Sequence, residues 1–127
     1  MTDGAGGVFD ADALEGMRDD IEVEIETWSP ERGARRVIIW SVVVDGVPYV
    51  RSYRGVNGRW YQDVLREPQC AIHTRGRRVT VRAVAALEPE TIQAVSDALA
   101  AKYADDGAMP DMLVPVVLGT TLRLNPA

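Results

Sequence analysis

The feature that most constrains this fold is a run of seven residues, 21–27, in which apolar and polar side chains alternate. Ile21, Val23 and Ile25 fall on one face of an extended chain, and three glutamates fall on the other. Alternation with a period of two is typical of a strand that buries one face and exposes the other to water. Such strands belong to antiparallel sheets, so the pattern predicts a sheet of that type.

Further strand-like segments follow, and turn residues separate them. Residues 36–44 are rich in β-branched side chains and apolar on both faces, which is typical of a central strand. Asp45-Gly46 is a two-residue hairpin signal, so residues 47–53 are expected to return antiparallel to that strand. Three more strands are expected at residues 69–74, 79–87 and 120–124, and a tight Arg75-Gly76-Arg77 turn joins the first two.

The remaining segments predict helices. Asp10 is a candidate N-cap for a short helix, residues 59–66 predict a second helix, and Pro89 begins a long amphipathic one. Six antiparallel strands with a few short helices favour a mainly β (α+β) fold, a six-stranded antiparallel split β-barrel closed against its helices. We expect this domain to span residues 10–127, after a flexible tail at residues 1–9.

The charge distribution points to a small anionic ligand. The net charge is −5, yet residues 32–87 hold eleven arginines and only three acids. An acidic chain repels the phosphate backbone of nucleic acid, so we expect no nucleic-acid partner. A barrel that binds a single strand through arginines and aromatics is the weaker alternative, and arginines that merely coat exposed strand faces are the purely structural one. A concentrated basic segment suits a small anion better.

The apolar runs and the cysteine content also constrain where the protein is located and which cysteine chemistry it can perform. The longest apolar runs are too short to cross a bilayer, and no secretion signal is recognised, so a cytoplasmic protein without a membrane span is expected. Cys70 is the single cysteine, which excludes an internal disulfide and a multi-cysteine metal site. We interpret Cys70 as a small buried hydrophobe and His73 as a strand-face residue, and we expect no metal site and no catalytic side chain.

The candidate anion site lies where two strands of the predicted hairpin end. Pairing across Asp45-Gly46 would place Arg36 opposite Tyr53 and Arg54. Two guanidinium groups on adjacent strands can grip one phosphate through paired hydrogen bonds. Gly55 would let backbone N–H groups approach the same anion. The indole rings of Trp40 and Trp60, with Tyr53 and Tyr61, could stack on a planar ring, and the structural alternative is that Trp60 and Tyr61 are core contacts of their helix.

These residues resemble a known family in their order and spacing. The segments Gly33-x-x-Arg36-Val37, Asp45-Gly46, Tyr53-Arg54-Gly55 and Trp60-Tyr61-x-x-Val64-x-x-x-Pro68 are similar to the deazaflavin-dependent nitroreductase group. That group belongs to the flavin-binding split β-barrel superfamily and is related in fold to pyridoxamine-phosphate oxidase. Three positions depart from its pattern: Glu31 replaces a lysine, Arg32 a serine and Asp63 an asparagine.

The resemblance implies an oxidoreductase that uses FMN or the deazaflavin coenzyme F420, with hydride transfer performed by the cofactor on a substrate that the sequence does not identify. It also implies a homodimer. The implied phosphate-binding arginine is Arg36, with Arg54 contacting the cofactor tail. The full set of candidate cofactor-binding residues is Arg36, Trp40, Arg51, Ser52, Tyr53, Arg54, Gly55, Trp60 and Tyr61. The alternative is a non-catalytic module that holds haem, with His73 as a possible ligand, or another phosphorylated ligand in the same pocket.

Overall fold

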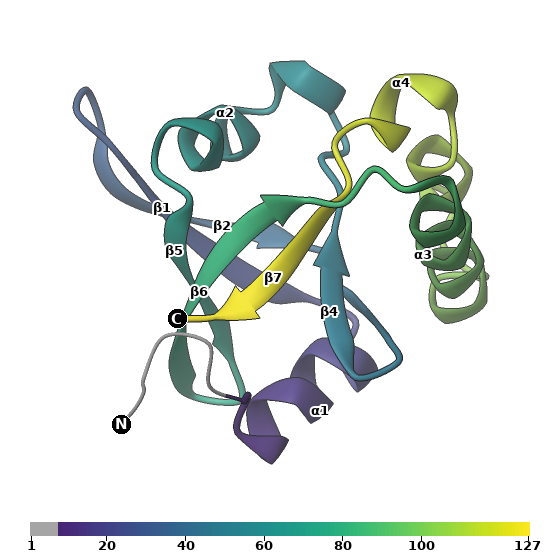
Figure 1. Cartoon of the computed structure of the whole chain (residues 1–127), viewed down its shortest axis with the longest axis horizontal. Helices are drawn as coiled ribbons and strands as arrows, with labels where there is room; N and C mark the ends of the chain where they lie inside the picture. The colour runs from purple at the N-terminus through teal and green to yellow at the C-terminus, as the bar shows by residue number, and fades with distance from the viewer. Residues whose placement is uncertain (1–7) are drawn as a thin grey trace.

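A computed structural model describes residues 8–127, and in this range seven strands form one antiparallel sheet (Figure 1). Their order across the sheet is β2-β1-β5-β6-β7-β4-β3. The strands are β1 (Val23–Ser29), β2 (Gly33–Ile39), β3 (Val42–Val44), β4 (Val47–Val50), β5 (Gln69–Thr74), β6 (Arg77–Ala85) and β7 (Leu122–Pro126). The expected tail at residues 1–9 falls mostly outside the described residues, and Phe9 packs against the core.

The sheet curls into a half-barrel because its two edges are consecutive in the chain. β2 and β3 lie at opposite edges, and only Trp40 and Ser41 join them. The chain can make this step only if the sheet bends until its edges approach each other. Helices α1 (Ala11–Asp19) and α2 (Arg59–Arg66) lie at the two ends of the curl, and α3 (Pro89–Lys102) packs outside β3 (Figure 1).

The expected count of six strands is wrong, because residues 36–44 do not form one strand. The backbone N–H of Ser41 donates to the hydroxyl of Tyr103 at 3.2 Å, and the Ser41 carbonyl accepts a hydrogen bond from Lys102 Nζ at 2.7 Å. Side chains from the end of α3 therefore satisfy the backbone groups that a neighbouring strand would otherwise bond. The strand divides at this point into β2 and β3, and the strand expected over 47–53 ends at Val50.

The predicted turns and helices are confirmed. Asp45 and Gly46 have φ angles of 52° and 79°, and Arg75 and Gly76 have 51° and 75°. Two successive positive φ angles identify the primed hairpin turns that suit twisted strands. The α2 helix occupies residues 59–66, and α3 begins at Pro89, as expected. The structure adds a short α4 (Pro115–Leu118) and the 3-10 turns η1 (Gly55–Asn57) and η2 (Met109–Met112).

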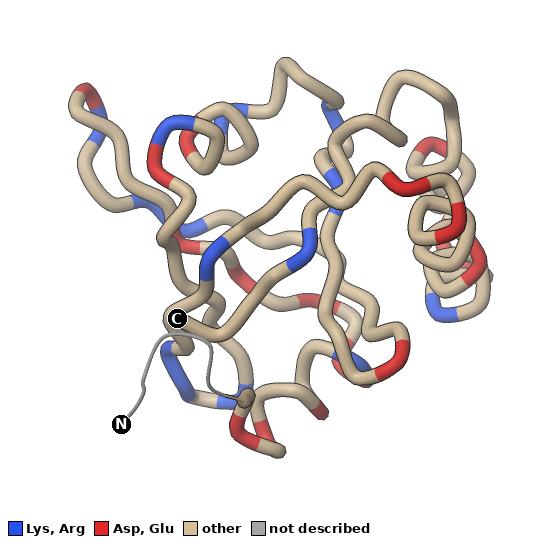
Figure 2. The backbone as a smooth tube through the Cα atoms, in the orientation of Figure 1, with Lys and Arg blue, Asp and Glu red and all other residues tan. Residues whose placement is uncertain are grey.

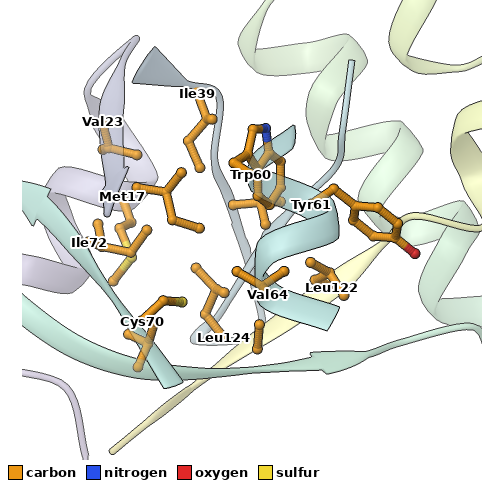
Figure 3. Close-up of a cluster of buried hydrophobic side chains, with 14 residues drawn as sticks. Met17, Val23, Ile39, Trp60, Tyr61, Val64, Cys70, Ile72, Leu122 and Leu124 are labelled. Atoms are coloured by element: carbon orange, nitrogen blue, oxygen red, sulfur yellow. The ribbon is translucent and has the colours of Figure 1, made fainter. Parts of the chain in front are cut away.

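Two apolar clusters hold these elements together. The larger fills the inside of the curl, where side chains of α1, α2 and the strands meet (Figure 3). The smaller lies between α3 and the outer face of β3 and β4, and it includes Val95, Leu99 and Tyr103. Among the residues described, no helix combines the length and apolar character needed to cross a membrane. The side chains leave a cavity at the end of the barrel beside α2.

Candidate functional site

A cavity of about 610 Å³ opens beside α2, between β2 and the segment that leaves β4. Its wall includes Val37 and Ile39 of β2, the linker residue Trp40, and Met112 of η2. The volume lies within the range of small-molecule sites, which is roughly 300–1,000 Å³. The cavity therefore has the size of a cofactor or substrate site.

Arginines without a carboxylate partner gather at this cavity. Among the described residues, seven of the thirteen arginines lie within 4.0 Å of an acidic side chain: 18, 32, 36, 66, 75, 77 and 78. Of the other six, four line the cavity: Arg35, Arg51, Arg54 and Arg59. Glu22 is the single acidic residue in the lining. The cavity wall thus carries an excess of positive charge that a bound anion would neutralise.

Two indole rings line the same cavity. The Trp40 ring stacks on Tyr103, with ring centroids 3.9 Å apart and an interplanar angle of 5°, and it also lines the cavity. Trp60 is the second residue of α2 and is 8% exposed, and its ring meets Tyr61 edge to face at 6.2 Å. Figure 3 places Trp60 and Tyr61 within the buried cluster, and Tyr61 does not line the cavity. Trp60 therefore serves the core and the cavity wall together, whereas Tyr61 serves the core.

The cavity rim is a tight turn that follows β4. The Ser52 hydroxyl donates to the carbonyl of Gly55 at 2.6 Å, and Gly55 has a φ of 63°, which favours glycine. A Cβ at Gly58 would lie 2.4 Å from Ser52 Oγ, so no larger residue fits there without displacement. Ser52 and the glycines shape the turn, and this turn directs Tyr53 and Arg54 outward at the cavity.

The placement of Arg36 differs from the expectation. β2 pairs with β1, not with β4, so Arg36 lies opposite Glu26 and far in register from Tyr53 and Arg54. Its Nε donates to Glu24 at 2.8 Å, and it does not line the large cavity. Arg35 does line it. Strand alternation explains the difference, because Arg35 shares its face with the inward-facing Ile39, whereas Arg36 faces outward.

The sequence carried a signal for Arg35 that was missed. Residues 35, 37 and 39 lie on one face of an extended chain, so the apolar pair at 37 and 39 marks residue 35 as facing the same side. Arg59 was also missed, and it lines the cavity from the first position of α2. No local pattern marks it, because only the packing of α2 against the sheet brings it there.

His73 and Cys70 lie away from the cavity lining. His73 on β5 has its Nε2 at 2.7 Å from Glu26, which Arg78 also contacts. These two partners hold the pKa of Glu26 down at about 2, with Arg78 the larger cause. Cys70 is buried, as expected, and burial raises the pKa of its thiol to about 12. Neither residue is placed to act on a ligand in the cavity.

Two of the departures from the family pattern form an ion pair with each other. Asp63 is 2% exposed and accepts two hydrogen bonds of 2.9 Å from Arg32. It also accepts from the Thr27 hydroxyl at 2.9 Å and from Arg66 at 3.1 Å. The pair joins the β1–β2 turn to α2. Arg32 and Asp63 thus form a charged pair at the two positions where the resembling group has serine and asparagine.

Comparison with known proteins identifies relatives by sequence and by fold. The model of a family described as "Uncharacterized protein conserved in bacteria (DUF2255)" matches residues 13–124. No curated protein matches the chain.

Solved structures share the fold at low sequence identity. The haem storage protein HutZ from Vibrio cholerae is 12% identical, with a TM-score of 0.65 over 95% of this chain and 92% of its own. An F420-H2 dependent reductase is 14% identical, with a TM-score of 0.62 over 84% and 96%. A putative pyridoxamine 5′-phosphate oxidase from Listeria innocua is 10% identical, with a TM-score of 0.63 over 90% and 88%. The chain therefore has a split-barrel fold.

Proposed function

The chain belongs to the DUF2255 family of bacterial proteins, and we propose that it binds a flavin or deazaflavin cofactor in the arginine-lined cavity and acts as an oxidoreductase. The observation that carries this proposal is that four arginines without an acidic partner among the described residues, and two indole rings, line one cavity of about 610 Å³. FMN and F420 each combine a planar ring with a phosphate on a flexible chain. The cavity offers both kinds of contact.

The residues present fit such a group. The guanidinium groups of Arg35, Arg54 and Arg59 are exposed and have no acidic partner among the described residues, so they are available to phosphate oxygens. Trp40 offers an apolar surface for the ring and is itself held in place by the stacked Tyr103. The tight turn from Ser52 to Gly58 fixes the position of Arg54.

A bound flavin or deazaflavin would supply hydride transfer, which no protein side chain performs. The residues of this chain would bind, orient and shield the ring from water. A protein that binds the cofactor and leaves the chemistry to it agrees with the cavity lining, which contains no histidine and no cysteine.

Haem is the second candidate, because the haem storage protein HutZ shares the fold and because propionates would also suit the arginines. The ligand that the sequence offers for haem is its single histidine, His73. That residue lies outside the cavity lining and contacts Glu26, so haem in this cavity would need another axial ligand. The lining offers Tyr53 and Met112.

Titration of the purified protein with FMN, F420 and haem tests the proposal. Fluorescence quenching reports the two flavin-type ligands, and a Soret band reports haem. We expect FMN or F420 to bind, and we expect Arg35→Gln to weaken binding about tenfold to a hundredfold, the effect of about 1.5–3 kcal/mol for one charge-assisted hydrogen bond. Failure of both to bind below about millimolar concentration, which is weak for a resident cofactor, would overturn it.

Arg36→Gln is the matched control for that variant. It removes the same charge one residue along the same strand, at a position that does not line the cavity. We expect it to leave ligand affinity within about twofold, because the group is screened by water and paired with Glu24. Equal losses in Arg35→Gln and Arg36→Gln would show that binding depends on total charge and not on the cavity.

A homodimer, expected from the resemblance, and a cytoplasmic location, expected from the composition, are part of the same proposal. Light scattering coupled to size-exclusion chromatography measures the assembly directly. A monomeric mass at micromolar concentration, with cofactor present, would remove the dimer from the proposal and leave the cavity argument intact.

A further inference from the structure

Arg51 differs from every other arginine that lines the cavity, because it is buried. It lies at the end of β4 with 1% of its surface exposed, whereas Arg35, Arg54 and Arg59 are exposed. Its burial lowers the pKa of its guanidinium to about 10. No acidic side chain of the described residues lies within 4.0 Å of it. By contrast, Asp63, the buried acid of α2, has two arginine partners.

The contacts of Arg51 are all to uncharged groups. Nε donates to Thr121 Oγ1 at 2.8 Å, and Nη1 donates to Ser96 Oγ at 2.9 Å and to the Met112 carbonyl at 3.0 Å. Nη2 donates to the Ile92 carbonyl at 2.8 Å. A guanidinium has five N–H groups, so these four bonds leave one N–H of Nη2 without a partner among the described residues. They also leave the positive charge without a counterion.

A buried cation without an anion is costly. Desolvation of a charge costs several kcal/mol, and neutral hydroxyl and carbonyl groups recover only part of that. A structural role alone, in which Arg51 joins β4 to α3, η2 and β7, could be served by its hydrogen bonds. It does not account for a full charge at the wall of a cavity that other cations already surround.

Arg51 is bonded to elements other than those that carry Arg35 and Arg59. Its partners Ile92 and Ser96 belong to α3 and Met112 belongs to η2, and Met112 lines the cavity with it. Arg35 and Arg59 instead enter the cavity from β2 and α2. The positive side chains of the cavity are therefore of two kinds: three exposed ones, the rim arginines Arg35, Arg54 and Arg59, and the buried Arg51 beside η2.

We propose that Arg51 binds the anionic group of a small organic substrate, and that this substrate is a carboxylate. The inference rests on the proposed function in one respect, since the cofactor phosphate is taken to occupy the rim arginines. With 1% of its surface open, Arg51 meets the anion through a single N–H, and its remaining four bonds hold it in place. A planar carboxylate supplies the acceptor oxygen and the missing negative charge together.

A pair of isosteric probes tests this without any flavin. Benzoate and benzamide have nearly the same shape, and only benzoate is charged. We expect benzoate to bind the purified protein at least tenfold more tightly than benzamide, measured by NMR titration. The preference should fall below threefold in Arg51→Met, which keeps an unbranched side chain, and should stay above tenfold in Arg54→Gln and Arg35→Gln.

Two results would overturn the proposal. One is equal affinity of the unaltered protein for the two probes. The other is a preference that survives Arg51→Met but disappears in Arg54→Gln or Arg35→Gln, which would assign anion binding to the rim. If Arg51→Met fails to fold, the Nε resonance of Arg51 in the unaltered protein decides. It should shift with benzoate and not with benzamide, and no shift with benzoate rejects the proposal. Because no flavin is present, these outcomes stand apart from a failure of cofactor binding.

Discussion

Two arginine-rich regions of this protein differ in what surrounds them. At the β5–β6 turn, Arg75 contacts Glu15 and Asp20, and Arg77 contacts Asp10 and Asp12. Figure 2 shows the basic segments of this turn beside the acidic segments of α1. At the cavity, Arg35, Arg54 and Arg59 have no acidic partner among residues 8–127. The difference separates arginines that hold the fold together from arginines left available for a ligand.

The comparison also shows that a local excess of arginines in the sequence is not enough to locate an anion site. Residues 32–87 are strongly basic as a whole, yet five of their eleven arginines contact acids of the first 31 residues, and Arg32 contacts Asp63. Local charge density therefore overstates the anion site. What marks the site is the absence of a partner, and this depends on which elements the fold brings together.

The largest expected effect on stability comes from breaking the ion pair between Arg32 and Asp63. Asp63→Ala leaves Arg32 without its anion in a mostly buried position, so we expect it to lower the free energy of unfolding by about 3–5 kcal/mol, measured by urea denaturation. The Arg32→Ser, Asp63→Asn double variant restores the pattern of the resembling family. It should lose less than the sum of the two single variants, and simple additivity would contradict the pairing.

The next effect concerns the helix that supplies the acids. A Cβ at Gly16 would lie 2.1 Å from Thr74 Oγ1, so Gly16→Ala forces α1 away from β5. We expect a loss of about 1–3 kcal/mol in the free energy of unfolding, as for other overpacked sites. Gly107→Ala is the matched control, because its Cβ would meet nothing within 4 Å. Similar losses for the two variants would exclude close helix packing as the cause.

A smaller effect follows from the ionised Glu26. Its folded-state pKa is about 2, below its ordinary value near 4.5, because Arg78 and His73 contact it. The unfolded chain therefore takes up a proton first as the pH falls, and this contribution to stability is present above about pH 4.5 and is lost between pH 4.5 and 2. Melting temperatures across this range should fall less steeply in Glu26→Gln than in the unaltered protein.

The smallest effect on stability is expected at the cavity. Arg59 is exposed and has no acidic partner among the described residues, so Arg59→Gln should change the free energy of unfolding by less than about 0.5 kcal/mol. The same denaturation experiment measures it. A loss comparable to that of Asp63→Ala would show that the cavity arginines also support the fold, and the comparison between the two regions would fail.

Much of the secondary structure could be predicted because its causes are local. The alternation at residues 21–27, the Asp45-Gly46 and Arg75-Gly76 turns and the proline at the start of α3 each act within a few residues. Arg54, Trp40 and Trp60 were singled out in the same way, and all three line the cavity. Their use by a cofactor stays a prediction.

What the sequence alone determined, then, is most of the strands, turns and helices, together with the basic and aromatic residues from which a site could be built. The tertiary structure alone decided that β2 breaks at Ser41, that Arg35 and not Arg36 reaches the cavity, and that Arg51 is buried without an acid. The physical reason is the sequence separation over which each interaction acts. Turn and strand preferences act between near neighbours, whereas the break at Ser41 depends on Lys102 and Tyr103, about sixty residues away.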